Sequence, residues 1–554
     1  MTSSSNRLPA THAFLIAVIS FAVFVPVLIF GFPGNSGDFR HHFQISQALN
    51  YSIEYGSFFA DWVFQENNGY GAVTVRFYPP LLHYFSAIGK TITGDWILAF
   101  YLTFSIWSLI GGLGMYLFAN DLLKNKKAAS LAASLFLLSP YHFTQAYSAA
   151  MLGEFAALSL LPFAFYFTRR ICVSHDLIGI CGFAASFALI IVSSVPQTVV
   201  GAIFAGIYFL LCLDRKRLLQ SVAAFATAFA LALTCSAFYW LRLVFEVKWL
   251  KIFQPNTAPD YDFRNHFLLS NIHFDDQGIW LVNLMFGILT ALVAVSLVLS
   301  RKPFALARQP EIRNILILLA VASLLMLPIS LLIWEHLNVL QRIQFPWRLM
   351  SVVTIAACII PAAAAQKLAS EYSHNLRPLV LILIGICLMY GTFSLKQIVL
   401  GAAYIEKSEF TLLAKSLVTA KGLEHWLPIW ADEHTFDNAL QVDAAGRSTD
   451  ITTWEPELRR FTITEGQETK ARVGLLYYPH WHTTLNGSEV ETQRSQDGAV
   501  EIEIPSGETN VEIKFVEPGT TRVARIVSAA SWLALLSLLF VGFRRRHLRS
   551  ENMP

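Results

Sequence analysis

Charged side chains are scarce in this sequence. Only 14% of its 554 residues are Asp, Glu, Lys or Arg, whereas 55% are hydrophobic. Soluble domains carry about 25% charged residues, so the composition excludes an ordinary soluble protein. Apolar segments of about 20 residues recur along the chain, which is typical of a polytopic α-helical membrane protein.

The sequence also lacks the short motifs of several functional classes. It has no Walker A sequence, no GxGxxG in a strand–helix setting and no HExxH, so a nucleotide-driven pump is not indicated. Its six cysteines all lie in or beside apolar segments, and none belongs to a CxxC motif. Neither a disulfide framework nor a thiol or zinc site is therefore expected, and buried packing is the simpler interpretation. No nucleic-acid partner is expected either.

About twelve apolar segments could form transmembrane helices. They lie near residues 11–32, 95–118, 128–147, 155–168, 177–195, 198–213, 219–240, 279–300, 314–333, 348–366, 378–397 and 526–543. The first is too long for a signal peptide and has no small-residue cleavage pattern, so we expect a retained helix. Together they predict a transmembrane domain over 1–397 and a last span with a basic cytoplasmic tail over 526–554.

Lys and Arg are concentrated in alternate loops between these segments. Examples are residues 124–127, 169–170, 215–217 and 544–549. Because positively charged loops remain in the cytoplasm, both chain termini are expected there. The outward loops are then 33–94, 148–154, 240–278, 334–347 and 398–525.

The last outward stretch, 398–525, differs from the rest of the chain. Short runs alternate apolar and polar residues at 459–466, 471–479, 499–505 and 510–518, as half-buried strands do. Asn486-Gly487 is a strong signal for a tight hairpin turn. We therefore predict a small antiparallel extracytoplasmic β-domain, β-rich from about residue 440.

Asp38 is the main candidate functional residue. It follows the first apolar segment within GDFRHHFQ (37–44), where an acid near the bilayer is costly unless it has a partner or a task. Service as a general base is one such task, and helix N-capping is the alternative. His41 and His42 share a helix face with Asp38 and are candidate substrate or, with Asp38, metal ligands. Ordinary interfacial histidines are the alternative.

Four further residues are candidates for the same chemistry. Glu154 lies at the start of the helix after the second outward loop. It is a candidate second catalytic acid, and the alternative is that its charge simply stabilises the helix dipole. Arg348 and Arg76 are candidate phosphate ligands, because a guanidinium binds phosphate through two hydrogen bonds. For Arg348, headgroup anchoring beside a tryptophan is the alternative. Tyr78 is a substrate-binding candidate or a residue that shapes its loop.

Several segments resemble a known family. An acid after the first span, followed by DW…YPPL, resembles the GT-C membrane glycosyltransferases. QRIQFPWRLM (341–350), GLEHWLPIWAD (422–432) and YYPHWHTTLNG (477–487) resemble its bacterial branch of YfhO-like proteins, which carries the label 6-pyruvoyl-tetrahydropterin synthase-related domain.

The resemblance implies a GT-C-like helical fold and an activity. The activity is inverting transfer of a hexosyl or pentosyl group from a polyprenyl-phosphate donor to an envelope glycan or lipid acceptor. It implies the outer side of the bacterial inner membrane as the place of reaction and Asp38 as the base. No certain cofactor is implied, and a divalent cation is the one candidate.

A second class of function stays open, namely a non-catalytic envelope protein. Such a protein is either a transporter of lipid-linked sugars or an assembly scaffold. A transporter is expected to carry charged or broken helices at the membrane midplane. The predicted spans are largely uncharged at their centres and the polar residues gather at one surface, which favours a surface site.

Overall fold

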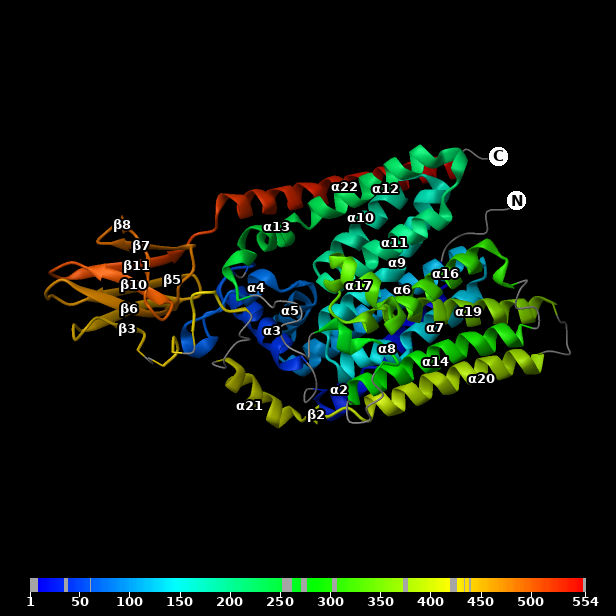
Figure 1. Cartoon of the computed structure of the whole chain (residues 1–554), viewed down its shortest axis with the longest axis horizontal. Helices are drawn as coiled ribbons and strands as arrows, with labels where there is room; N and C mark the ends of the chain where they lie inside the picture. Colours follow the sequence, from blue (N-terminus) through cyan, green and yellow to red (C-terminus); the bar gives the residue numbers. More distant parts are fainter. Residues whose placement is uncertain are drawn as a thin grey trace.

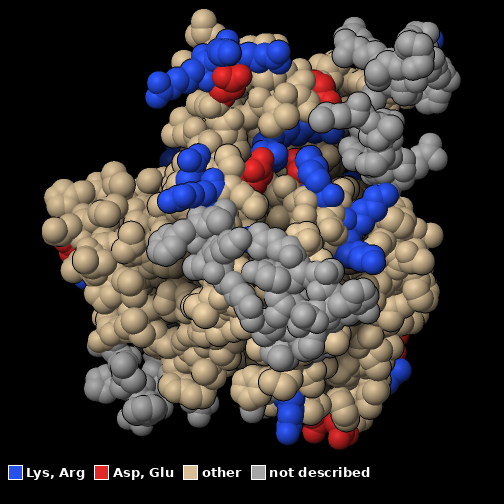
Figure 2. All heavy atoms as spheres, turned by 90° about the vertical axis from the view of Figure 1, so that its right-hand side faces the viewer, with Lys and Arg blue, Asp and Glu red and all other residues tan. Residues whose placement is uncertain are grey.

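A helical bundle forms one end of the molecule and a β-sandwich the other, with short helices between them (Figure 1). The computed structural model describes residues 8–33, 38–59, 61–251, 262–270, 277–300, 306–371, 377–418, 426–432, 434–437 and 440–551. Both chain termini lie at the end of the bundle that is farthest from the sandwich. Lys and Arg side chains gather on this end, with several acidic ones between them (Figure 2).

Eight helical segments of the described chain are long and apolar enough to cross a membrane. They are Ala10–Phe30 (α1, Ala10–Ala22, and α2, Val25–Phe30), Trp96–Leu123 (α6), Leu152–Ser174 (α9), Val195–Cys212 (α11), Arg215–Cys235 (containing α12, Leu218–Cys235), Ile279–Leu299 (within α14, Gln277–Leu299), Pro346–Ser370 (containing most of α19, Met350–Glu371) and Gly519–Arg544 (within α22, Gly519–Glu551). A ninth span results if α16 (Pro310–Leu325) and the segment Pro328–His336, which meet at an 83° bend, cross together.

All twelve apolar segments of the sequence analysis contain helix, and the polytopic helical fold is confirmed. Three of them do not reach the length of a full span in the described residues, namely α7 (Lys126–Leu137), α10 (Leu177–Ile191) and α20 (Arg377–Ser394). In α20 the described apolar part is Ile384–Ser394. A helix rises about 1.5 Å per residue, so α7 and α10 are shorter than the roughly 30 Å hydrocarbon layer. The number of full-length described spans is therefore eight or nine rather than about twelve.

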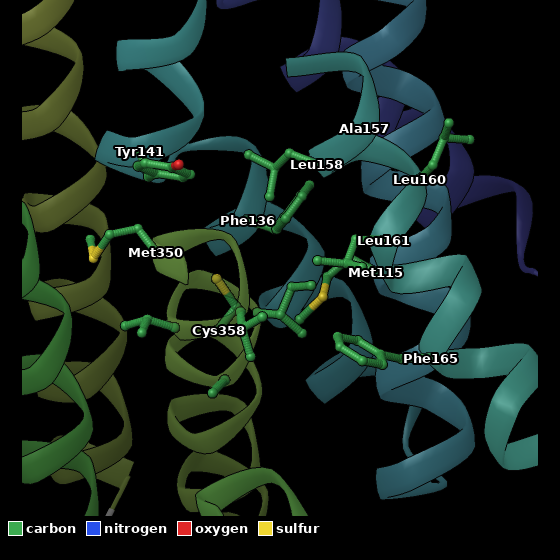
Figure 3. Packing of buried hydrophobic residues seen from close by; sticks show 14 of the residues in the cluster. Met115, Phe136, Tyr141, Ala157, Leu158, Leu160, Leu161, Phe165, Met350 and Cys358 are labelled. Atoms are coloured by element: carbon green, nitrogen blue, oxygen red, sulfur yellow. The ribbon is translucent and has the colours of Figure 1, made fainter. Parts of the chain in front are cut away.

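Helix α19 lies at the centre of the bundle. Of its apolar window 94% is buried, against 11% for α22 at the periphery. Figure 3 shows Met350 and Cys358 of α19 facing the same core as Phe136 of α7 and Leu158 of α9. Because α19 is enclosed on all sides, the residues at its start are held rigidly.

Short helices connect the bundle to the β-sandwich. They are α3 (Phe39–Glu54), α4 (Thr74–Phe77), α5 (Leu81–Thr93), α13 (Ala237–Glu246) and α21 (Lys407–Val418). A two-residue strand, β1 (Phe32–Pro33), pairs with β2 (Tyr404–Ile405) just before α21. Gly31 adopts φ +96°, and a Cβ there would lie 2.0 Å from the Ile405 carbonyl oxygen, so only glycine permits this close approach.

The β-sandwich consists of two antiparallel sheets. One has the order β3-β6-β10-β9 and the other β4-β5-β11-β7-β8. The strands are β3 (Val442–Asp443), β4 (Thr449–Glu455), β5 (Leu458–Ile463), β6 (Thr469–Leu476), β7 (Trp481–Leu485), β8 (Ser488–Val490), β9 (Gln493–Arg494), β10 (Ala499–Ile504) and β11 (Thr509–Phe515). Inward-facing residues such as Ile463, Val473 and Ile513 are fully buried.

The hairpin predicted at Asn486-Gly487 is confirmed. Leu485 pairs with Ser488, and the two residues between them have φ values of 47° and 85°. Positive φ at both central positions is the mark of a type I′ turn, whose twist matches that of the flanking strands. The small antiparallel domain near the C-terminus is confirmed with it.

Parts of several predicted segments lie outside the described residues. They include 34–37 and 60 of the predicted loop 33–94, 252–261 and 271–276 of the predicted loop 240–278, 419–425, 433 and 438–439 of the predicted stretch 398–525, and the last three residues of the tail.

Candidate active site

Glu154 and Arg348 form a buried ion pair at the start of two spans. Glu154 lies in the first turn of α9, and Arg348 lies in the 3₁₀ turn Pro346–Leu349 that leads into α19. Arg348 Nε is 3.1 Å from Glu154 Oε2, and the two side chains are only 10% and 3% exposed. The Nε–H bond does not point along this line, so the contact is an ion pair rather than an aligned hydrogen bond.

Two neutral donors hold the other oxygen of Glu154. The Tyr141 hydroxyl donates to Oε1, and Gln197 Nε2 donates to the same oxygen at 2.9 Å. Gln197 Nε2 also lies 3.2 Å from the Arg348 carbonyl oxygen. The carboxylate is thus oriented towards Arg348 from inside the protein, which suits a positioning role better than direct contact with substrate.

The guanidinium of Arg348 is fixed on one side and lightly held on the other. Its Nη1 donates to the Ile343 carbonyl at 2.9 Å and to Gln344 Oε1 at 3.0 Å. Its Cζ lies over the Phe345 ring, 4.8 Å from the ring centre. Within the described residues, Nη2 donates a weak hydrogen bond to Met151 Sδ at 4.0 Å. The Nη2 end is therefore the part of Arg348 best suited to receive an anion.

Asp38 occupies the N-cap position of α3 but does not act as a cap. Its side chain is exposed and makes no capping hydrogen bond to α3. Its backbone N–H donates to the Ala149 carbonyl at 3.3 Å, in the segment just before α9. The capping alternative therefore has no support from the described contacts, and Asp38 is anchored near the start of the helix that carries Glu154.

Tyr78 is partly buried and packs against His42 of α3. Burial raises the pKa of Tyr78, the charges of Asp38 and Glu154 raise it further, and Arg348 opposes them. The centre of its ring lies 5.4 Å from that of His42 and 6.0 Å from that of Trp426, and both pairs are arranged edge to face. The sequence candidates Asp38, Tyr78, Glu154 and Arg348 thus belong to one region, although they come from four separate segments.

His42 is buried and its ring is already engaged. Its Nε2 accepts the Leu152 N–H at 3.3 Å, so in the neutral ring Nδ1 carries the proton and donates to His83 Nε2 at 3.2 Å. His83 Nδ1 then donates to Ser46 Oγ at 3.0 Å. Burial lowers the pKa of both histidines to about 3. These contacts assign His42 to fixing the start of α9 rather than to binding a ligand.

His41 remains next to Asp38 and is half-buried. Burial lowers its pKa, and the charge of Asp38 opposes this effect. Among the described residues no group of three or more His, Cys, Asp or Glu side chains is arranged to hold a metal ion. The predicted trio Asp38, His41 and His42 does not form such a group there, because both ring nitrogens of His42 have other partners.

Arg76 lies apart from this region in a separate ion-pair network. Its side chain is fully buried and contacts Asp61 at 3.0 Å, Glu246 at 2.8 Å and, closer still, Glu517. Burial alone would raise the pKa of Glu246, but His480 and Arg76 hold it at about 2. These contacts leave little of the guanidinium for a phosphate.

The same network ties several parts of the chain together. Arg242 of α13 and Arg525 of α22 both contact Asp61, at 3.0 and 2.9 Å. Tyr478, in the segment between β6 and β7, donates to Glu246 Oε2 at 2.7 Å. The network therefore joins the stretch between α3 and α5, α13, the β-sandwich and α22.

Sequence reasoning missed two residues of the site. Gln197 lies in the first turn of α11, at the end of the sequence Ser-Ser-Val-Pro-Gln, and its polarity at the start of an apolar segment is a signal that could have marked it. His83 lies in the segment RFYPPLLHY (76–84), which is aromatic and apolar apart from His83 and Arg76. Neither signal indicates a partner, because the partners lie far away in sequence.

The apolar helices, the β-sandwich and this buried acid–arginine pair define a polytopic membrane protein with a candidate site near the sandwich. The chain belongs to the family described as the 6-pyruvoyl-tetrahydropterin synthase related domain, a membrane protein, whose model matches residues 75–400. The matched region contains Tyr78, Glu154 and Arg348 and excludes Asp38 and the sandwich. No curated protein matches the sequence.

Among solved structures, the chain is similar to several, including the following three. The arabinofuranosyltransferase AftD from Mycobacteria shares 14% identity at a TM-score of 0.45, covering 71% of this chain and 27% of that one. The oligosaccharyltransferase AglB from Archaeoglobus fulgidus shares 13% identity at 0.42, covering 77% and 57%. ArnT from Cupriavidus metallidurans shares 13% at 0.28, covering 72% and 90%. The chain thus spans only part of the length of the first two.

Proposed function

We propose that the protein is a GT-C-type glycosyltransferase that moves a hexose or pentose from a polyprenyl-phosphate donor to an envelope glycan or lipid. One observation carries the proposal. An exposed, uncapped Asp38 and an Arg348 held by Glu154 both contact the short segment before α9, through Ala149 and Met151, although they come from distant parts of the chain. An acid and a guanidinium at one membrane surface are the groups that transfer from a lipid phosphate requires.

The chemistry follows from these two groups. Asp38 accepts the proton of the acceptor hydroxyl as its oxygen forms the new bond to the sugar C1. The bond between C1 and the phosphate oxygen breaks, and the polyprenyl phosphate leaves with the bonding electrons. Arg348 neutralises the charge that develops on this phosphate, and Glu154 keeps the guanidinium in place. Attack from the face opposite the leaving group inverts the configuration at C1.

The protein's orientation is part of the proposal. The basic end of the bundle is assigned to the cytoplasm, because Lys and Arg favour that side (Figure 2). The site and the sandwich then lie on the outer side of a bacterial inner membrane. A divalent cation is proposed only as an additional charge on the phosphate, and loss of activity with EDTA, restored by Mg²⁺ or Mn²⁺, tests it.

Replacement of Asp38 tests the catalytic role directly. In a deletion strain, Asp38→Asn at normal expression should lower the rate at which the missing sugar is restored to the glycan by about 10²–10⁴-fold. The matched control is Asp450→Asn, an exposed acid on β4, which should restore the glycan fully. Full restoration by Asp38→Asn would instead support the non-catalytic transporter or scaffold.

A further inference from the structure

A cavity of about 450 Å³ lies alongside α3, away from its catalytic end. Its walls come from the second half of α3, the end of α5, the start of α6 and the helix α21. In Figure 1 α3, α5 and α21 lie between the bundle and the sandwich, with α21 below α3. Nothing in the mechanism above uses this cavity.

Two buried amides line the cavity. Gln47 is 6% exposed, and its Nε2 donates to the Ala414 carbonyl of α21 at 2.9 Å. Its Oε1 has no hydrogen-bond partner among the described residues. Asn50, one turn further along α3, donates to Thr91 Oγ1 at 3.0 Å. A buried acceptor without a partner is unfavourable, and a turn of the Gln47 amide towards the cavity would let a ligand hydroxyl supply the missing hydrogen bond.

Aromatic rings complete the lining. Phe410 is buried and Trp96 is half-buried, and both reach the cavity together with Tyr51. Rings of this kind cover the apolar C–H faces of a sugar, while amides bind its hydroxyls. A small number of polar groups among aromatic walls is the common composition of a small-molecule site.

The charges at the rim do not form an anion site. Lys407 Nζ lies 2.7 Å from Asp95 Oδ2, and Lys90 Nζ donates to the Gly94 carbonyl at 2.6 Å. Two of the three lining lysines are therefore already engaged, and Glu54 adds a negative charge. This balance favours a neutral polyhydroxylated ligand over a phosphate.

The cavity also has a suitable position relative to Asp38. Gln47 follows Asp38 by nine residues on α3, which corresponds to about 14 Å along the helix. A few linked sugar units span such a distance. We infer that the cavity binds sugar units of a glycan acceptor that lie behind the unit whose hydroxyl reacts. The inference rests on the proposed function, and it names the acceptor class as an oligosaccharide.

Binding of simple sugars tests this inference without any catalytic assay. The probes are the methyl glycosides of glucose, galactose, mannose and arabinose, added singly to the full-length protein in nanodiscs and followed by saturation-transfer NMR. At least one glycoside should receive saturation, and Gln47→Met should reduce that signal by about fivefold or more. Gln366→Met is the matched control, because Gln366 likewise donates to a carbonyl, that of Leu123, elsewhere in the bundle.

The outcomes separate the two proposals. No signal from any glycoside, or a signal that Gln47→Met leaves unchanged, overturns the sugar site. A broadened ³¹P line of inorganic phosphate that sharpens in Lys407→Met also overturns it, in favour of an anion site. Asp38→Asn should retain the glycoside signal. If Asp38→Asn is fully active in cells while the sugar still binds, the proposed catalysis fails and the binding site stands.

Discussion

Glu154 and Arg348 meet in a 3.1 Å ion pair at the start of α9 and of α19, with both side chains almost fully buried. The acid that the sequence suggested as a second catalytic group is therefore turned towards the arginine that the sequence suggested as a phosphate ligand. Tyr141 and Gln197 fix the carboxylate from behind. The pair is best regarded as one unit, in which the acid orients the cation.

Arg348→Lys tests the geometry of this unit. Lysine keeps the positive charge but loses the planar fork, so the apparent donor KM should rise about tenfold while kcat falls less. The measurement is transfer by purified protein over a range of donor-lipid concentrations. The exposed neighbour Arg342→Lys serves as control and should leave both constants unchanged. An unchanged donor KM in Arg348→Lys would contradict the role in phosphate binding.

Glu154→Gln tests the pair through stability. The change leaves the Arg348 charge buried without a counter-charge, which typically costs about 3–5 kcal/mol. Thermal unfolding of the purified variant should begin at a clearly lower temperature. The double variant Glu154→Gln/Arg348→Met removes both charges and should recover part of the loss. Equal stability of Glu154→Gln and wild type would contradict a buried ion pair.

The His42–His83 contact predicts a pH dependence of stability. In the folded protein the pKa of each ring is lowered to about 3, below the usual 6.5, so the unfolded chain binds more protons between these values. Stability should therefore fall as the pH decreases below about 6.5, by at most about 1.4 kcal/mol per pH unit for each histidine. His83→Gln should flatten this slope in unfolding measured between pH 7 and pH 4.5.

The control for the histidine experiment is the exposed His336. His336→Gln should leave the slope as in the wild type, because this exposed residue takes no part in the His42–His83 contact. A slope in His83→Gln as steep as in the wild type would mean that the buried pair does not remain neutral.

Arg76→Met tests whether the second network is structural. Its removal leaves three acidic groups, Asp61, Glu246 and Glu517, with less positive charge in a buried space. Loss of one partner of a buried pair costs about 3–5 kcal/mol, so the unfolding temperature should drop sharply. The control is Arg460→Met, which breaks an exposed pair with Glu512 and should cost less than about 1 kcal/mol. A stable Arg76→Met with impaired donor binding would instead return Arg76 to the substrate site.

The ion-pair network around Arg76 should also lose its stabilising effect at low pH. Burial raises the pKa of Glu246 and Glu517, but their cationic partners overcome this effect and lower both values to about 2. Their contribution to stability should be complete above the usual value of about 4.5 and decline as the pH falls towards 2.

Cysteine labelling tests the orientation. In a variant without the native cysteines, Ser488→Cys on β8 and Asp38→Cys should react with an impermeant maleimide added to intact spheroplasts. Lys124→Cys and Lys216→Cys should react only after the membrane is opened, because positively charged loops stay inside. Labelling of Ser488→Cys from the cytoplasmic side alone would remove the basis for an outward-facing site.

The spans, the strands and the hairpin turn could be predicted from the sequence. Apolar length marks the spans, since a helix in lipid needs a continuous apolar surface. Alternation of period two marks the strands, and Asn486-Gly487 marks a turn that needs positive φ twice. These properties are set by neighbours in the chain, so they can be read without knowledge of the fold.

The partners of the charged side chains were decided only by the tertiary structure. Sequence alone placed Arg76 and Arg348 in the same category, as cations near the outer membrane surface. In the folded protein Arg76 contacts three carboxylates. Arg348 contacts one carboxylate, and its Nη2 makes only a weak hydrogen bond to Met151 within the described residues. A buried charge must find its compensation in space, and the segments that supply it lie up to several hundred residues away. No local pattern can encode that choice.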